Sequence, residues 1–118
     1  MEVLFENQKI QDEYYNSRYI QKKYGYIFSV GLEKMLGAID AATCAYDIKV
    51  LPQFRMHLLK GNLKGFYSLS PDNKKTKWRV PAKCLDESNK ERVPDNNEAK
   101  LLKETKKLRL YKIGDYHD

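Results

Sequence analysis

Apolar residues recur with helical spacing in the first third of the chain. The most regular pattern lies in residues 27–42, where steps of three and four separate Phe28, Leu32, Met35, Leu36 and Ile39. This spacing places the apolar side chains on one side of a helix, which is predicted to face the core. Residues 8–24 also favour a helix, which Gly25 interrupts, and residues 3–6 before it favour a short strand.

The later part of the chain alternates between apolar and polar positions, as strands do. Four segments show this pattern: residues 55–59, 66–70, 77–82 and 108–113. In the first, Met56 and Leu58 are expected on one side and His57 on the other. In the third, Trp78 and Val80 are expected on one face, with Lys77 and Arg79 exposed on the other. The pattern predicts an α+β fold in which two N-terminal helices pack on a mostly antiparallel, twisted sheet.

Residues 86–107 interrupt this order of strands. The segment is strongly charged and contains almost no apolar run, so it is expected to be an insertion between two strands. Asp95 and Glu98 have the spacing of a capping box, which favours a short helix over residues 96–106 carrying Leu101 and Leu102. A mobile loop is the alternative for this segment.

Composition limits the chain to one domain with a basic surface. The 118 residues carry a net charge of +6, with 42% hydrophobic and 32% charged residues and a pI near 9.2. These values suit a single globular domain, residues 1–118, with one core. The basic balance indicates a polyanionic partner, with nucleic acid as the first candidate and an acidic protein as the second.

Neither a membrane location nor a metal site is indicated. No apolar run reaches the roughly 18 residues of a membrane span, and the first residues lack the order of a secretory signal, so a cytoplasmic protein is expected. Cys44 and Cys84 have no metal-ligand spacing, so we expect no zinc, no disulfide framework and no cofactor. They are interpreted as two buried or idle thiols.

Positive charge and both histidines suggest cleavage of a ribose-phosphate backbone. Between positions 60 and 79 only Asp72 opposes the basic residues Lys60, Lys64, Lys74, Lys75, Lys77 and Arg79. RNA cleavage without a metal requires a base, an acid and cations for the phosphate, and His57 and His117 are candidates for the first two roles. Lys60 and Arg79 are candidates to stabilise the phosphate. Tyr67, Trp78 and Tyr116 are candidates to stack on bases.

Each of these residues also has a simpler interpretation. A lone histidine on a half-buried strand is often a satisfied polar group, and Trp78 and Tyr67 suit packing within the sheet. Lys74 and Lys75 suit a solvated turn. The chain contains no glycine-rich phosphate loop, GxSxG or HExxH motif, which argues against the common NTPases, serine hydrolases and zinc proteases.

Three stretches together resemble a known family: HLLKGNLKGFYSL at 57–69, KWRV at 77–80 and GDYH at 114–117. They look like the HigB-type growth-inhibition toxins of the RelE/ParE superfamily of type II toxin–antitoxin systems. The order of predicted elements agrees with that fold across nearly the entire chain. The chain departs from the family pattern in the insertion at 86–107, and in Lys77, where related sequences often have Asn.

The resemblance implies a ribosome-dependent endoribonuclease, an mRNA interferase that cuts messenger RNA at the small-subunit decoding site. It also implies a cognate helix-turn-helix antitoxin, similar to HigA, as partner. Carried over by position, the catalytic residues would be His57, Lys60, Arg79 and His117. RNA contacts would come from Lys64, Tyr67, Lys77, Trp78, Asp115 and Tyr116.

Two other functions remain open at this stage. The same superfamily contains ParE-like toxins that inhibit DNA gyrase, so the fold alone does not assign an activity. A non-catalytic regulatory member of a toxin–antitoxin system is the third possibility, with the insertion as an interaction surface. The presence of both histidines with Lys60 and Arg79 favours the nuclease.

Overall fold

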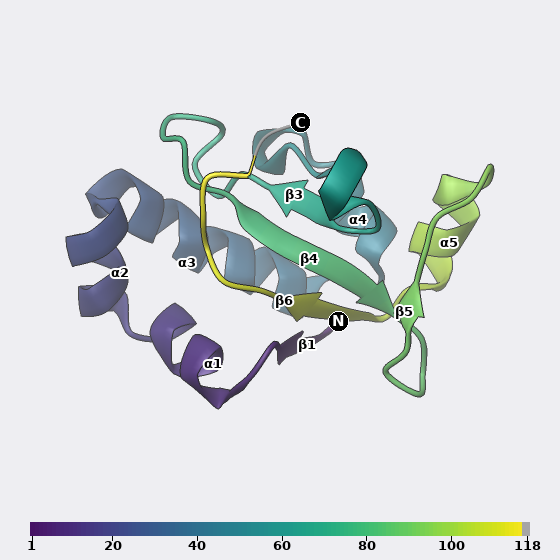
Figure 1. Ribbon diagram of the computed structural model, residues 1–118. Coiled ribbons are helices and arrows are strands. Elements are labelled where there is room, and N and C mark those ends of the chain that lie inside the picture. The colour runs from purple at the N-terminus through teal and green to yellow at the C-terminus, as the bar shows by residue number, and fades with distance from the viewer. Residues whose placement is uncertain (117–118) are drawn as a thin grey trace.

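The computed structural model describes residues 1–116 and has an α+β architecture (Figure 1). The α-helices of this part of the chain are α1 Gln8–Tyr14, α2 Ser17–Tyr24, α3 Tyr26–Ala41, α4 Ala45–Lys49 and α5 Glu98–Glu104. The strands are β1 Glu2–Phe5, β2 His57–Leu58, β3 Tyr67–Leu69, β4 Val80–Leu85, β5 Glu91–Arg92 and β6 Lys107–Leu110. Two short 3₁₀ helices, η1 Pro52–Phe54 and η2 Gly61–Leu63, flank β2.

The described strands form one mixed sheet. Its order is β1-β6-β4-β3-β2, and β5 pairs with the end of β4. β1 runs parallel to β6, with Glu2 opposite Lys107, whereas the other pairs of described strands are antiparallel. The mostly antiparallel sheet predicted from sequence is therefore present, with one parallel pair at its edge.

The helical region contains more helices than the two expected. The segment 8–24 is divided because Asn16 caps a new helix, its Oδ1 accepting a hydrogen bond from Tyr19 N at 3.0 Å. Gly25, with a φ of 96°, then separates α2 from α3. α4 was not predicted, and its start is fixed by Asp47 Oδ2, which accepts a hydrogen bond from Thr43 N at 2.9 Å.

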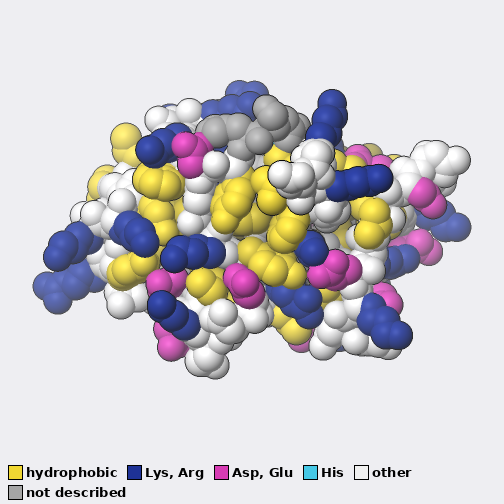
Figure 2. Space-filling model, in the orientation of Figure 1, with side chains coloured by type: hydrophobic (Ala, Val, Ile, Leu, Met, Phe, Trp, Pro, Cys, Tyr) yellow, Lys and Arg dark blue, Asp and Glu magenta, His cyan; other side chains and the backbone are white. Residues whose placement is uncertain are grey.

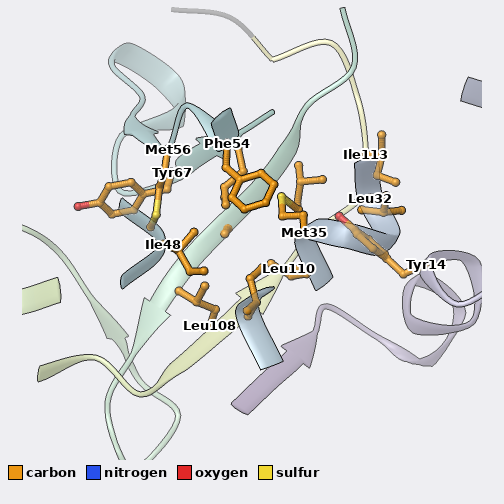
Figure 3. Packing of buried hydrophobic residues seen from close by; sticks show 14 of the residues in the cluster. Tyr14, Leu32, Met35, Ile48, Phe54, Met56, Tyr67, Leu108, Leu110 and Ile113 are labelled. Atoms are coloured by element: carbon orange, nitrogen blue, oxygen red, sulfur yellow. The ribbon is translucent and has the colours of Figure 1, made fainter. Parts of the chain in front are cut away.

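The core lies between α3 and one face of the sheet. In the predicted stripe of α3, Phe28, Leu32, Met35 and Ile39 are buried, and Leu36 is partly buried against them. The sheet contributes the alternating apolar side chains of three strands: Tyr67, Leu69, Val80, Ala82, Cys84, Leu108 and Leu110. Figure 3 shows Met35 with Leu108 and Leu110 in this packing, and Tyr67 beside Met56.

Strand boundaries differ from the sequence pattern where the insertion begins. β4 covers Val80–Leu85, not residues 77–82, because its far end pairs with both β6 and β5. Part of the insertion is therefore an extension of the sheet. The rest of the insertion contains α5, so the prediction of a short helix there is confirmed and the mobile loop is not. The cap residue is Asn97, however, and not Asp95. The buried side chain of Leu102 packs α5 against the core.

Gly31 lets the loop after β3 approach α3 closely. A Cβ atom at Gly31 would lie 2.5 Å from Pro71 O, whereas one at Gly37, in the same helix, would meet nothing within 4 Å. Gly31→Ala is therefore expected to lower the free energy of unfolding by about 1–3 kcal/mol through overpacking. Gly37→Ala should raise it by roughly 0.5–1 kcal/mol, since alanine favours helix. Urea denaturation of both variants tests this contrast, and equal effects would contradict the close packing.

Candidate nucleic-acid interface

The sheet has a second face, opposite α3, that carries polar and aromatic side chains. In Figure 1, α3 passes behind β4 and β6, so the viewer looks onto this second face. Register and alternation place the following side chains on it: His57, Phe66, Ser68, Pro81, Lys83, Arg109 and Tyr111. These residues lie in β2, β3, β4 and β6, or directly beside β3 and β6 in the case of Phe66 and Tyr111, and they define the candidate interface.

A cation lies among aromatic rings near the middle of the second face. Lys83 Nζ is 4.3 Å from the centre of the Phe66 ring, and that ring meets Tyr111 edge-on at 4.9 Å. Lys83 also pairs with Glu91 Oε2 at 2.9 Å, and Arg109 Nη1 is 3.4 Å from the Tyr111 hydroxyl. Figure 2 shows hydrophobic side chains exposed in the middle of this side of the molecule, with Lys and Arg side chains around them. Aromatic faces beside cations are typical of surfaces that bind single-stranded nucleic acid.

His57 lies at the β2 end of this face and is half-buried. Its Nδ1 is 2.8 Å from the carbonyl oxygen of Arg55. Because a carbonyl only accepts hydrogen bonds, Nδ1 carries the hydrogen, and Nε2 is then the acceptor nitrogen of the neutral ring. The main chain therefore fixes the tautomer that a general base requires.

Ser68 is the cross-strand neighbour of His57 on the same face. Its hydroxyl oxygen is buried and has no hydrogen-bond partner among the described residues. Buried hydroxyls are usually paired, so the surroundings of His57 contain a hydrogen-bonding group that the packing of residues 1–116 leaves unused.

The predicted lysines of the first motif, Lys60 and Lys64, lie three and seven residues after His57. Lys60 is the residue before η2 and Lys64 the residue after it, and both side chains are exposed. Positive φ angles at Gly61 and Gly65 form the turns of this short loop. Both lysines are therefore exposed to solvent in the loop that follows the His57 end of the second face.

Arg79 does not have the exposed position expected of a phosphate contact. Arg79 is only 6% exposed, and its Nη1 donates to the carbonyl oxygens of Thr76 at 2.6 Å and Trp78 at 2.8 Å. The prediction that it lines up with Lys77 on an exposed side is wrong, because the guanidinium turns back to close the loop before β4. In this arrangement Arg79 holds the loop and does not reach outward.

Of the predicted stacking residues, Tyr67 lies in the core and Trp78 is partly buried against it. Tyr67 is 0% exposed, and its hydroxyl donates to Glu98 Oε2 of α5 at 2.9 Å. Burial, with that hydrogen bond, raises the pKa of Tyr67 well above its ordinary value. The Trp78 ring meets Tyr24 edge-on at 5.0 Å, and exposed Lys77 lies over it at 4.8 Å. A base-stacking role for Tyr67 is therefore wrong for this conformation, since no face of its ring meets solvent.

The segment after β6 is fastened beside Arg79. Arg79 N donates to Gly114 O at 2.7 Å, and Gly114 N donates to Arg79 O at 3.1 Å. The Tyr116 ring lies against Gly114, where an added Cβ would come within 2.6 Å of it. Asp115 is exposed between them. His117, the second expected catalytic histidine, lies outside the described residues.

Sequence reasoning missed the residues at the centre of the interface: Phe66, Lys83, Arg109 and Tyr111. Lys83 was missed because the predicted strand stopped at residue 82, one position too early to include it. A signal was present, since Arg79, Pro81 and Lys83 continue the same alternation. Phe66 and Tyr111 could be paired only once the register across β4 was known.

The cysteines do not form part of the interface. Both are free, Cys44 partly buried and Cys84 fully buried. Burial raises the pKa of Cys84 to about 11, so it is a neutral thiol at physiological pH.

Within residues 1–116, no three His, Cys, Asp or Glu side chains gather in a way that would hold a metal ion.

Comparison with models of protein families and with curated proteins found no match to this chain. Among the helices of residues 1–116, none is both long and apolar enough to cross a membrane.

Proposed function

We propose that the chain is an endoribonuclease toxin of a type II toxin–antitoxin system, similar to the HigB branch of the RelE/ParE superfamily. It would act in the cytoplasm, cut messenger RNA at the decoding site of the ribosome and inhibit growth until a helix-turn-helix antitoxin neutralises it. The observation that carries the proposal is the position of His57. Its tautomer is fixed by the Arg55 carbonyl, and it shares one face with Lys83 and two aromatic rings.

In the proposed reaction, a ribose 2′-hydroxyl attacks the neighbouring phosphate of the same RNA strand. His57 Nε2 accepts the proton of a ribose 2′-hydroxyl, and the 2′-oxygen attacks the neighbouring phosphorus. The bond from phosphorus to the 5′-oxygen breaks, a second acid protonates that oxygen, and a 2′,3′-cyclic phosphate forms. Lys60 stabilises the added negative charge of the transition state. His117 is the proposed acid, on the ground of its place in the DYH motif.

The fold offers support for the RelE-like part of the proposal. β1 is followed by helices and then by the antiparallel strands β2, β3 and β4, with β6 returning beside β1. This order agrees with the order that the resemblance implies. In this proposal Arg79 closes the loop before β4. Lys60, Lys64 and Lys83 contact the RNA backbone.

Expression of the chain followed by mapping of messenger 5′ ends tests the proposal. We expect discrete cuts within codons that depend on translation. Intact messages would overturn the nuclease proposal. Intact messages together with inhibited supercoiling by purified gyrase would instead support the gyrase-inhibiting class, and growth inhibition without either effect would point to a regulatory partner.

Cations of the second face should contribute to RNA affinity. The double variant Lys83→Gln/Arg109→Gln is expected to weaken binding of a short single-stranded RNA about tenfold or more at low salt. It should also reduce the slope of log affinity against log salt by about 0.7 for each phosphate that the variant no longer neutralises. Fluorescence anisotropy over a salt series measures both quantities.

The matched control removes the same charge elsewhere. Lys9 and Lys22 are exposed on α1 and α2, so Lys9→Gln/Lys22→Gln changes net charge equally without altering the second face. An equal loss of affinity in both double variants would mean that overall charge, and not the second face, binds the RNA.

A further inference from the structure

A cleft lies next to His57, between the η2 loop and the insertion. Its volume is about 290 Å³, close to the lower end of ligand pockets in proteins. The side chains that line it are Leu58, Leu59, Lys60, Lys64, Val93 and Pro94. The insertion therefore supplies one wall of a cleft whose other wall is the basic loop that follows His57. β5 and α5, which bracket Val93 and Pro94, lie at the right edge of the molecule in Figure 1.

The chemistry of the cleft suits a nucleotide. Leucine, valine and proline side chains form an apolar surface, and the exposed ammonium groups of Lys60 and Lys64 stand beside it. None of the described lining residues is acidic. The nearby Asp95 turns toward α5, where its Oδ1 accepts a hydrogen bond from Asn97 N at 2.9 Å. An apolar surface beside cations fits a base together with its phosphate better than it fits an acidic peptide helix, whose carboxylates need several paired cations.

Val93 is unusual within the insertion. It is a large apolar residue that is 58% exposed in a segment otherwise rich in charge. Opposite it, Gly61 and Gly65 have no side chain, and a Cβ atom at either would meet nothing within 4 Å. The space above the η2 loop is therefore open to a flat group lying against Val93.

The cleft begins one residue after His57, because Leu58 and Leu59 both line it. Leu58 follows His57 in β2, and Leu59 N pairs with Phe66 O at 2.9 Å, which brings Leu59 onto the same face as His57. A phosphate held between His57 and Lys60 would thus have its neighbouring base within reach of the cleft.

We propose that this cleft binds the nucleobase next to the scissile phosphate, and that Val93 and Pro94 of the insertion set which base is preferred there. The inference rests on the proposed function for the identity of the reaction. It goes beyond that function in assigning a specificity role to the insertion.

Val93→Asp tests the inference. The exposed position tolerates a carboxylate in the folded state, but the negative charge beside the RNA backbone repels it. We expect about tenfold weaker binding of a short single-stranded RNA by the full chain in fluorescence anisotropy. We also expect a changed base distribution at the position adjoining the cuts when messenger 5′ ends are mapped. Val93→Ala, which adds no charge, should leave folding intact and alter the base distribution more than the affinity.

Ala99→Asp is the control, because Ala99 is exposed on α5 of the same insertion but does not line the cleft. If Val93→Asp binds and cuts RNA as the unaltered chain does, the inference is overturned while the proposed nuclease stands. If the unaltered chain binds RNA without cutting it and Val93→Asp weakens that binding, the cleft stands and the nuclease proposal fails. If the unaltered chain binds no RNA, or if Val93→Asp impairs only binding of a protein partner, the cleft does not hold a nucleotide.

Discussion

Replacing His57 with asparagine is expected to reduce messenger cleavage by about 10²–10⁴-fold, the usual contribution of a positioned general acid or base. Asparagine retains a donor near the position of Nδ1, so the hydrogen bond to the Arg55 carbonyl can persist. It lacks the second ring nitrogen, so it cannot accept a proton there. The variant therefore separates proton transfer from local structure. The cleavage rate on purified ribosomes programmed with a defined message is the measurement.

The control for this result is Asn62→Ala, an exposed change in the η2 loop close to His57. It should cleave at nearly the rate of the unaltered chain. The thermal midpoint of His57→Asn should remain close to that of the unaltered chain. Full cleavage by a stable His57→Asn variant would remove His57 from the proposed mechanism, whereas loss of cleavage with loss of folding would assign it a structural role.

Arg79→Ala is expected to lower the free energy of unfolding by about 2–4 kcal/mol. The substitution truncates a side chain of a residue that is only 6% exposed, leaving space in the packing. It also leaves the carbonyl oxygens of Thr76 and Trp78 without the donors that now reach them at 2.6 and 2.8 Å. Urea denaturation of the purified variant measures the change.

Lys75→Ala provides the comparison, because Lys75 is exposed in the same loop and should change stability by no more than about 0.5 kcal/mol. Cleavage by Arg79→Ala should be assayed well below its unfolding midpoint. A variant as stable as the unaltered chain but unable to cleave would restore Arg79 to the role of a phosphate contact that the sequence pattern suggested.

The fold was predictable where a single periodicity extended over many residues. The stripe of α3 from Phe28 to Ile39 is buried as expected, since four regularly spaced apolar residues leave one face for the core. The break at Asn16 was not predicted, because the helical spacing of apolar residues continues across it and only the cap hydrogen bond to Tyr19 reveals it. β4 was misplaced because its end is fixed by pairing with β5 and β6, which local sequence does not encode.

The candidate site was predictable only in part, for a related reason. His57, Lys60 and Lys64 lie close together in sequence, so their proximity followed from the motif. Alternation alone cannot tell which strand residues meet solvent, since that depends on what packs over each face. Tyr67 therefore proved to be a core residue held by Glu98, whereas Lys83 joined the second face.

The parallel pairing of β1 with β6 also affects the order in which the protein can fold during synthesis. Glu2 pairs with Lys107, and Phe5 pairs with Leu110, so the first strand has no sheet partner until nearly all the described residues have been made. Pairings this distant in sequence form late, and unpaired strand edges attract other chains in the meantime. Until β6 has been synthesised, the edge of β4 that faces it has no partner strand, and closing that edge is a step that a protein bound to the nascent chain could accelerate or prevent.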